Sequence, residues 1–293
     1  MRNEQLEQDI ISSGGIISSY QAYADWLSEQ GDPRGEFVRV QLKLEEKGVP
    51  KNVRAKLRRR QNALLKKHRI EWLGPLASLL GETTNVEKHT FERGFSHTIQ
   101  SRSVTDGELA CLHEYPLLHT LDLRYNSEVT EAGLAHVGGL GALRVLNLVG
   151  TETTDRGLGK LIDSSLHTLY LGFTAITDAG LVNVGQLGSL RRLTLNSNRA
   201  FTDDGLAHLS KLIGLEDLKL SHTNVTDSGL AHLATMKHLQ TIDLGDTDLT
   251  DAGLAHLMKI GALRTLRLGD LADTAFSKGA ISKLRQQCYV PAR

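Results

Sequence analysis

The sequence predicts an α/β fold in which a small all-α N-terminal domain precedes a right-handed solenoid, with a parallel β-sheet on the concave face and short helices on the convex face. The first observation is a recurring LxxLxL pattern, whose frames begin at Leu118, Leu143, Leu166, Leu190, Leu215, Leu239 and Leu263. Successive frames lie 25, 23, 24, 25, 24 and 24 residues apart, and a period in the twenties is typical of a solenoid. The second observation is the T-D-x-G-L line between frames. The third is that residues 1–80 lack this period.

Each copy contains a strand signal followed by a helix signal. The alternation of leucine and polar residues in L-x-L predicts a short strand with one buried face. Asp or Thr in T-D-x-G-L can cap a helix, and leucines three residues apart form one apolar stripe. A helix of about two turns is unstable alone in water, so each copy must bury its leucines against its neighbours. Strands stack at about 4.8 Å and helices at about 8–10 Å, which predicts a curve with the strands inside.

These copies resemble leucine-rich repeats, specifically the T-D-x-G-L variety of bacterial proteins, from about Phe95 to Leu271. After L-x-L-x-x the family usually has asparagine, which appears here as Asn126 and Asn198. The other copies have threonine there, at Thr151, Thr174, Thr223 and Thr247. Both asparagine copies are 25 residues long, so we expect the amide to bond backbone groups across the wider turn. The hydroxyl reaches far enough only in the shorter turns.

The domain boundaries follow from the period. We expect a helical domain at 1–80, a junction with a degenerate first repeat at 81–117, repeats at 118–271 and a C-terminal capping helix and tail at 272–293. Phe276, Ile281 and Leu284 have the spacing of that final helix.

The N-terminal third shows helical spacing instead of the repeat. We expect a helix capped by Ser18 or Ser19 that stops at Gly31, a second from Asp32–Pro33, and a third that breaks near Gly74–Pro75. Trp26, Leu27, Phe37 and Trp72 would form one small core. The string YADWLSEQGDPRGEFVRVQ resembles the bacterial repeat-companion domain, over about residues 5–100. That family carries no established chemistry, so the resemblance implies architecture and no reaction.

No enzyme signature appears in the sequence. Walker A, H-E-x-x-H, G-x-S-x-G, C-x-x-C and G-x-G-x-x-G motifs are all missing. We therefore expect no enzymatic activity, no cofactor and no metal. His136, His208, His232 and His256 occupy the same place in their copies, but stacked helices hold such side chains too far apart for a shared metal ion.

Composition limits the partners and the compartment. Lys plus Arg and Asp plus Glu both number 34, so no net charge draws the whole chain to nucleic acid or membrane. The two cysteines make no disulfide framework, the N-terminus lacks an apolar segment, and no run is long enough for a membrane span. We expect a cytoplasmic protein that is a monomer.

The polar positions of the strands predict the binding surface. Leucines face the core, whereas the residues between them differ in every copy and include exposed aromatics beside arginine and lysine, a composition typical of protein interfaces. We expect an unidentified protein partner to bind the concave face through Arg124, Tyr125, Tyr170, Phe173, Arg192, Asp217, Lys219, His222, Asp243 and Arg267.

A second hypothesis is binding of nucleic acid or an anionic surface through the basic run at 51–69. This run has no acidic residue and contains Lys51, Arg54, Lys56, Arg58, Arg59, Arg60, Lys66, Lys67 and Arg69. No aromatic residue interrupts it before Trp72, which argues against base stacking and makes nucleic acid the less favoured partner.

Overall fold

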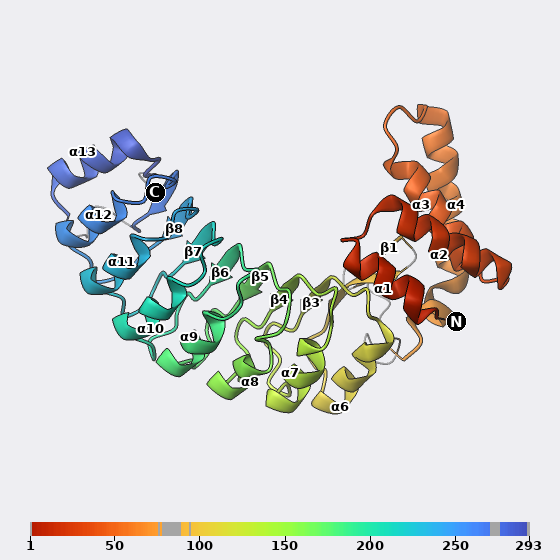
Figure 1. The fold of residues 1–293 in the computed structure, drawn as a ribbon, viewed down its shortest axis with the longest axis horizontal. Coiled ribbons are helices and arrows are strands. Elements are labelled where there is room, and N and C mark those ends of the chain that lie inside the picture. The colour runs from red at the N-terminus through yellow and green to blue at the C-terminus, as the bar shows by residue number, and fades with distance from the viewer. Residues whose placement is uncertain (1, 76, 78–88, 94, 270–275, 292–293) are drawn as a thin grey trace. The chain divides into compact units, whose positions relative to one another are not determined.

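The computed structural model describes residues 2–75, 77, 89–93, 95–269 and 276–291, and they form two compact units (Figure 1). The first unit comprises Met1–Ser101, Cys111–Leu121 and Leu140–Ala142. The second comprises Arg102–Ala110, Asp122–Gly139 and Leu143–Arg293.

The first unit contains four helices and an antiparallel pair of strands. The helices are α1 (Glu4–Ser12), α2 (Ile17–Glu29), α3 (Arg34–Glu45) and α4 (Lys51–Leu73), and the strands are β1 (His89–Glu92) and β2 (Phe95–Gln100). The helical N-terminal segment is confirmed, whereas α1 and the strand pair were not predicted. The cap predicted at Ser18 or Ser19 is wrong, because α2 begins at Ile17 and its N-cap residue, Ile16, makes no side-chain hydrogen bond.

Helix α3 lies between two apolar clusters, so the prediction of one common core is wrong. Leu27 and Val38 belong to a cluster with Trp26 packed against it. Phe37 and Trp72 belong to a separate cluster. Adjacent residues on α3 point toward different neighbours, because residues 37 and 38 lie about 100° apart around a helix.

The string that resembles the companion domain is explained by packing. A methyl group on Gly35 would lie 2.4 Å from Ser28 Oγ and 2.6 Å from the carbonyl oxygen of Ala24, so only glycine allows α3 to cross α2 this closely. Asp32 accepts hydrogen bonds from the Arg34 guanidinium at 2.6 and 2.9 Å. These contacts make the string part of the architecture of α2 and α3.

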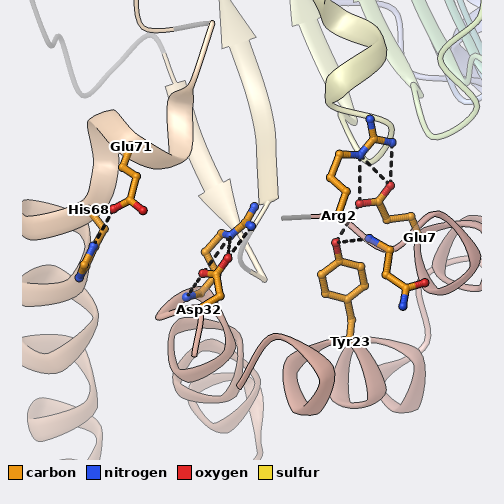
Figure 2. Close-up of polar contacts among 8 residues, drawn as sticks. Arg2, Glu7, Tyr23, Asp32, His68 and Glu71 are labelled. Carbon is orange, nitrogen blue, oxygen red and sulfur yellow. Dashed lines mark hydrogen bonds and ion pairs between the residues drawn. The ribbon is translucent and has the colours of Figure 1, made fainter. Parts of the chain in front are cut away.

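A buried carboxylate links α1 to α2 (Figure 2). Glu7 is only 3% exposed and accepts hydrogen bonds from the Tyr23 hydroxyl at 2.8 Å and from the Arg2 guanidinium at 2.8 Å. Burial, followed by the nearby charge of Glu7, raises the pKa of Tyr23. Because Arg2 neutralises the buried charge, this cluster is a structural ion pair.

The second unit repeats a strand and a helix in every copy (Figure 1). Its strands are β4 (Val145–Asn147), β5 (Thr168–Tyr170), β6 (Arg192–Thr194), β7 (Asp217–Lys219), β8 (Thr241–Asp243) and β9 (Thr265–Arg267), while β3 (Thr120–Asp122) falls at the division between the units. Its helices are α6 (Asp106–Leu109), α7 (Glu131–Gly138), α8 (Asp155–Gly159), α9 (Asp178–Val184), α10 (Asp203–Leu209), α11 (Asp227–Leu233), α12 (Asp251–Leu257) and α13 (Lys278–Gln287). A short 3-10 helix covers Ala110–Glu114.

Strands β4 to β9 confirm the predicted period and the right-handed solenoid. Each strand begins two residues after the first leucine of its frame, and neighbours pair in parallel and in register, as Leu169 with Leu193 and Leu218 with Ile242. The strands line the inner side of the curve in this unit and the helices its outer side (Figure 1). The central leucines of these strands are at most 1% exposed, so the core lies between the two layers.

Threonine caps each repeat helix, and the aspartate after it bonds to the next copy. Thr202 accepts a hydrogen bond from the backbone amide of Asp204, whereas Asp178 accepts from the Thr202 amide at 2.7 Å and from its hydroxyl at 2.9 Å. The same pairs recur as Asp106–Thr130, Asp155–Thr177, Asp203–Thr226 and Asp227–Thr250. Of the two cap candidates in the motif, threonine is the one that caps, as Thr250 does for α12, whereas Asp251 accepts a hydrogen bond from the Ser277 amide at 2.9 Å. Hydrogen bonds from the Ser277 side chain and then from its amide lower the pKa of Asp251.

The glycine of T-D-x-G-L is required by the aspartate of the preceding copy. A methyl group on Gly205 would lie 2.2 Å from Asp178 Oδ1, and the same contact would arise at Gly133, Gly180, Gly229 and Gly253 at 2.2–2.4 Å. Gly157 is the exception, because Glu131 replaces the preceding aspartate, and a methyl group there would meet only the end of the Leu134 side chain at 2.8 Å. The motif is therefore a contact between copies.

Asparagine and threonine end the strand turns in different ways, as predicted. Asn198 donates to the carbonyl oxygens of Leu195 in its own copy and Leu171 in the previous one, while its Oδ1 accepts from Thr174. The threonine hydroxyls donate to the strand-end leucine of their own turn, as Thr223 does to Leu220 at 2.6 Å. The amide of Asn198 thus joins two copies, whereas the hydroxyls of Thr223 and Thr247 bond only within their own turn.

The C-terminal end combines a helix with a strand-like tail. Leu284 of α13 is fully buried, as predicted, but Phe276 precedes the helix, and residues 272–275 of the predicted cap lie outside the described residues. Tyr289 pairs in parallel with Thr265, its amide donating to the Arg264 carbonyl at 2.8 Å. The tail therefore extends the sheet beyond β9.

Candidate functional site

The turn after each strand holds one residue in a left-handed backbone conformation. Equivalent positions in successive copies have φ between 55° and 66°, and they are Tyr125, Gly150, Phe173, Ser197, His222 and Asp246. The backbone amide of the following residue then donates a hydrogen bond to the carbonyl oxygen of the last leucine of the frame, as Asn126 does to Leu123 at 3.2 Å. The backbone of every copy thus requires a positive φ at this point.

Only Gly150 suits this conformation without strain. A non-glycine residue in the left-handed region costs on the order of 1 kcal/mol or more, and bulky side chains are uncommon there. Tyr125 has φ 59° and Phe173 has φ 55°, yet glycine would satisfy the turn at both positions. Backbone strain of this kind clusters at functional sites, which makes these two aromatic residues candidates for binding.

Both aromatic side chains project into solvent. Tyr125 is 59% exposed and Phe173 is 64% exposed. The Tyr125 ring lies over Gly150, where a methyl group would come within 2.6 Å of it, and the Arg102 guanidinium lies 5.8 Å from the ring centre. Gly150 therefore leaves room for the Tyr125 ring between the two aromatic copies.

Arg124 and Tyr170 lie close to these rings. The Arg124 guanidinium is paired with Asp122, and this hydrogen bond, despite partial burial, raises the pKa of Arg124. Arg124 precedes Tyr125 in the same turn, and Tyr170 ends the strand β5 that leads to Phe173. Arg124 is thus held in place by Asp122.

Basic side chains follow on the next two strands of the sheet, with Arg192 on β6 and Lys219 on β7. Arg192 and Lys219 make no ion pair with any residue that the structure describes. The Arg191 guanidinium donates to the carbonyls of Ser189 and Leu190 at 3.2 and 3.0 Å, so its position is fixed. Burial, together with the charges of Arg144 and Arg191, lowers the pKa of His167. Sequence reasoning missed Arg191 and His167, although their column follows the first leucine of each frame.

The other half of the face is a depression with mixed charge. Its volume is about 680 Å³, and its lining includes His222, Asp243, Asp246, Arg267 and Tyr289. His222 Nε2 lies 3.3 Å from Asp246 Oδ2. Tyr289 is 67% exposed and was not predicted, although the alternation Cys288, Tyr289, Val290 is a strand signal. The predicted residues Asp243 and Arg267 are register partners and share this depression.

Asp217, another residue predicted to bind the partner, has a carboxylate oxygen that is shielded from solvent. It is only partly exposed, and its Oδ1 is buried with no hydrogen-bond partner among the described residues. It pairs in register with Arg192. Asp217 therefore faces the basic half of the surface.

The basic run lies on α4 in the first unit, and two of its members have structural partners. Arg60 makes two hydrogen bonds of 2.6 Å to Glu36, and Arg54 donates to the carbonyls of Leu44 and Glu46. Including Arg54 and Arg60 in a free basic patch is therefore wrong. The remaining predicted members, Lys51, Arg58, Arg59, Lys66 and Lys67, are exposed.

The described ranges contain neither a metal cluster nor a membrane-spanning helix. No three His, Cys, Asp or Glu side chains within them come together as a metal site would require. No helix within them is long and apolar enough to cross a membrane. His136, His208, His232 and His256 lie on α7, α10, α11 and α12, on the outer layer of the second unit.

The second unit is a solenoid of repeats in which the core residues recur from copy to copy and the outward-facing residues of the strands differ. The family model described as "Leucine Rich repeat" matches residues 163–185, 215–234 and 235–258. The copies outside these matched ranges have the same strand, turn and threonine-capped helix as the copies inside them.

Two solved structures to which this chain is similar are internalins from Listeria monocytogenes. Internalin C2 is 22% identical over 67% of this chain and 79% of its own, with a TM-score of 0.49. The internalin inlF is 15% identical over 66% of this chain and 72% of its own, with a TM-score of 0.38. No curated protein matches the sequence. Neither likeness bears on what this chain binds.

Proposed function

We propose that the protein binds a protein partner through the concave face of its repeats and has no catalytic role. The observation that carries the proposal is the pair of exposed aromatic residues, Tyr125 and Phe173, held at positive φ where glycine would suit the turn. Their conformation costs stability. Tyr125 recovers part of this cost through its contacts with Gly150 and Arg102, whereas the Phe173 ring makes no aromatic or cation–π contact with the described residues. A partner that buries the rings supplies the missing compensation.

The side chains around Phe173 support a protein as the partner. Aromatic residues and arginine dominate the affinity of protein interfaces, and here Tyr170 and Phe173 lie on the same copy, while Arg192 begins the neighbouring strand opposite Thr168. The core-facing residue at the centre of each strand from β4 to β9 is leucine or isoleucine. The outward-facing residues differ between strands, and the same position is Val145 in β4 and Arg192 in β6. A variable surface on a constant scaffold fits recognition of one particular partner.

The decisive test replaces Phe173 with glycine. Phe173→Gly removes the ring and also relieves the positive φ, so we expect the variant to be as stable as the wild type or about 1 kcal/mol more stable. The same variant should lose the partner, because a buried aromatic anchor contributes about 2 kcal/mol or more to binding. Urea unfolding measures the stability, and affinity capture followed by mass spectrometry measures the partner.

Ser197→Gly is the matched control, because Ser197 has the same backbone conformation, with φ 58°, but no aromatic ring. It should gain similar stability and keep the partner. Capture that survives both Phe173→Gly and Tyr170→Ala would remove the aromatic centre from the interface and refute the proposal.

The proposal takes a monomer in the cytoplasm as the binding unit. Light scattering of the purified chain tests the monomer, and fractionation of the source cells tests the compartment. If the purified chain formed a stable dimer that covers Phe173, the partner would be a second copy of this chain and not a different protein.

A further inference from the structure

We propose that the exposed face of helix α4 binds double-stranded DNA through its phosphates, without sequence preference. The face consists of cations and small neutral residues, and its members are Lys51, Asn52, Ala55, Lys56, Arg58, Arg59, Asn62, Ala63, Lys66 and Lys67. The proposal concerns the first unit and does not depend on the concave face.

None of the six cations on this face is neutralised within the protein. Lys51, Lys56, Arg58, Arg59, Lys66 and Lys67 make no hydrogen bond or ion pair with the described part of the chain. Other helices of the same unit pair their cations with carboxylates, as Arg39 does with Asp25 at 2.9 Å and Lys43 with Glu46 at 2.7 Å. The contrast places the unbalanced positive charge of this unit on α4.

This arrangement destabilises the helix on its own. Lys56 and Arg59 lie three residues apart on one face, and like charges at this spacing cost about 0.2–0.5 kcal/mol per pair. The first turn of α4 has no acidic residue and begins with Lys51, although a helix N-terminus favours negative charge. A polyanion bound outside the helix would offset both costs.

The geometry of α4 fits the major groove of a duplex. Its 23 residues span about 34 Å, close to one turn of B-DNA. At about 100° per residue the six cations cover an arc of about 180°, so they reach both flanks of the helix. The major groove is about 12 Å wide, admits an α-helix, and has a phosphate backbone on each side.

Other polyanions fit this face less well. Two large apolar side chains of α4 are exposed near the cations, Val53 at 37% and Ile70 at 67%. They lie 17 residues apart in the sequence and do not form the continuous apolar stripe with which an amphipathic helix enters a membrane. No aromatic side chain is present on it to stack an unpaired base. Small residues such as Ala55 and Ala63 instead allow a backbone to approach closely.

The test measures binding of the full chain to a labelled random-sequence duplex of about 25 base pairs, by fluorescence anisotropy at several salt concentrations. If all six cations meet phosphates, affinity should fall about 10³-fold between about 50 and 200 mM salt. The fourfold variant Lys56→Gln, Arg59→Gln, Lys66→Gln, Lys67→Gln should bind on the order of 100-fold more weakly. Its log–log salt slope should be smaller by about 3.6, at about 0.9 per lost contact.

A control variant makes the same change in net charge elsewhere. Lys160→Gln, Lys211→Gln, Lys237→Gln and Lys259→Gln neutralise four exposed lysines of the second unit and should leave binding unchanged. The charge-preserving variant Arg58→Lys with Arg59→Lys should also bind like the wild type. The fourfold α4 variant should melt at the same or a higher temperature, because repulsion is removed.

Several results would overturn the proposal. These are no binding of the duplex by the wild type at about 50 mM salt, equal loss in the control variant, or tighter binding to single-stranded RNA or to phosphatidylserine vesicles than to the duplex.

Discussion

Deleting Leu215–His238 should leave a folded protein with one copy fewer, whereas deleting residues 215–226 alone should unfold the repeats. The longer deletion removes β7 and α11 together and joins Gly214 to Leu239, which begins the next frame. Asp203 would then accept from Thr250 in place of Thr226, and Gly253 would replace Gly229 beside it. Each copy offers its neighbour the same surface, so the new junction reproduces an existing one.

The shorter deletion keeps α11 but removes its strand, its turn and its threonine cap. It leaves the apolar stripe of α11 without the strand that covers it and shifts the frame by half a copy. Far-UV circular dichroism and thermal melting distinguish the two variants. Equal behaviour of the two would show that the copies are not interchangeable units.

Gly205→Ala should destabilise the repeats by about 2 kcal/mol, although alanine normally favours a helix over glycine by about 1 kcal/mol. The added methyl group would lie 2.2 Å from Asp178 Oδ1 and 3.1 Å from the backbone of Asp178, so the bonds between Asp178 and Thr202 must break or shift. Gly157→Ala is the matched control. It occupies the same position in its helix but follows Glu131, so it should be neutral or slightly stabilising.

A double-mutant cycle in urea isolates the cause. In an Asp178→Ala background the obstacle is absent, so Gly205→Ala should no longer destabilise. A penalty of the same size in both backgrounds would mean that the glycine has another role.

The period was enough to predict the strands, the parallel sheet and the capped helices, because these follow from where leucine and threonine recur. The period did not reveal that Asp178 contacts Gly205, because a contact between copies has no signature within one copy. The N-terminal helices were predicted only in part, since α1 has no strong start signal beyond Asn3, which caps it.

The sequence predicted which residues belong to the concave face, but it did not predict that two of them, Tyr125 and Phe173, have a positive φ. The positive φ of Tyr125 and Phe173 follows from the turn and not from either side chain, both of which disfavour it. One signal was available: Gly150 occupies the same column. Arg54 and Arg60 could not be separated from the other cations of the basic run, because their partners Leu44, Glu46 and Glu36 lie on another helix and its end.

The face that binds the partner can be located by site-specific photo-crosslinking. A benzoylphenylalanine replaces Tyr170 on β5 in one variant and His232 on α11 in another. Tyr170 is partly exposed and His232 is exposed in the free protein. We expect a covalent adduct with the captured partner from position 170 and none from position 232. An adduct from position 232 alone would place the binding site on the helical side of the repeats and contradict the account.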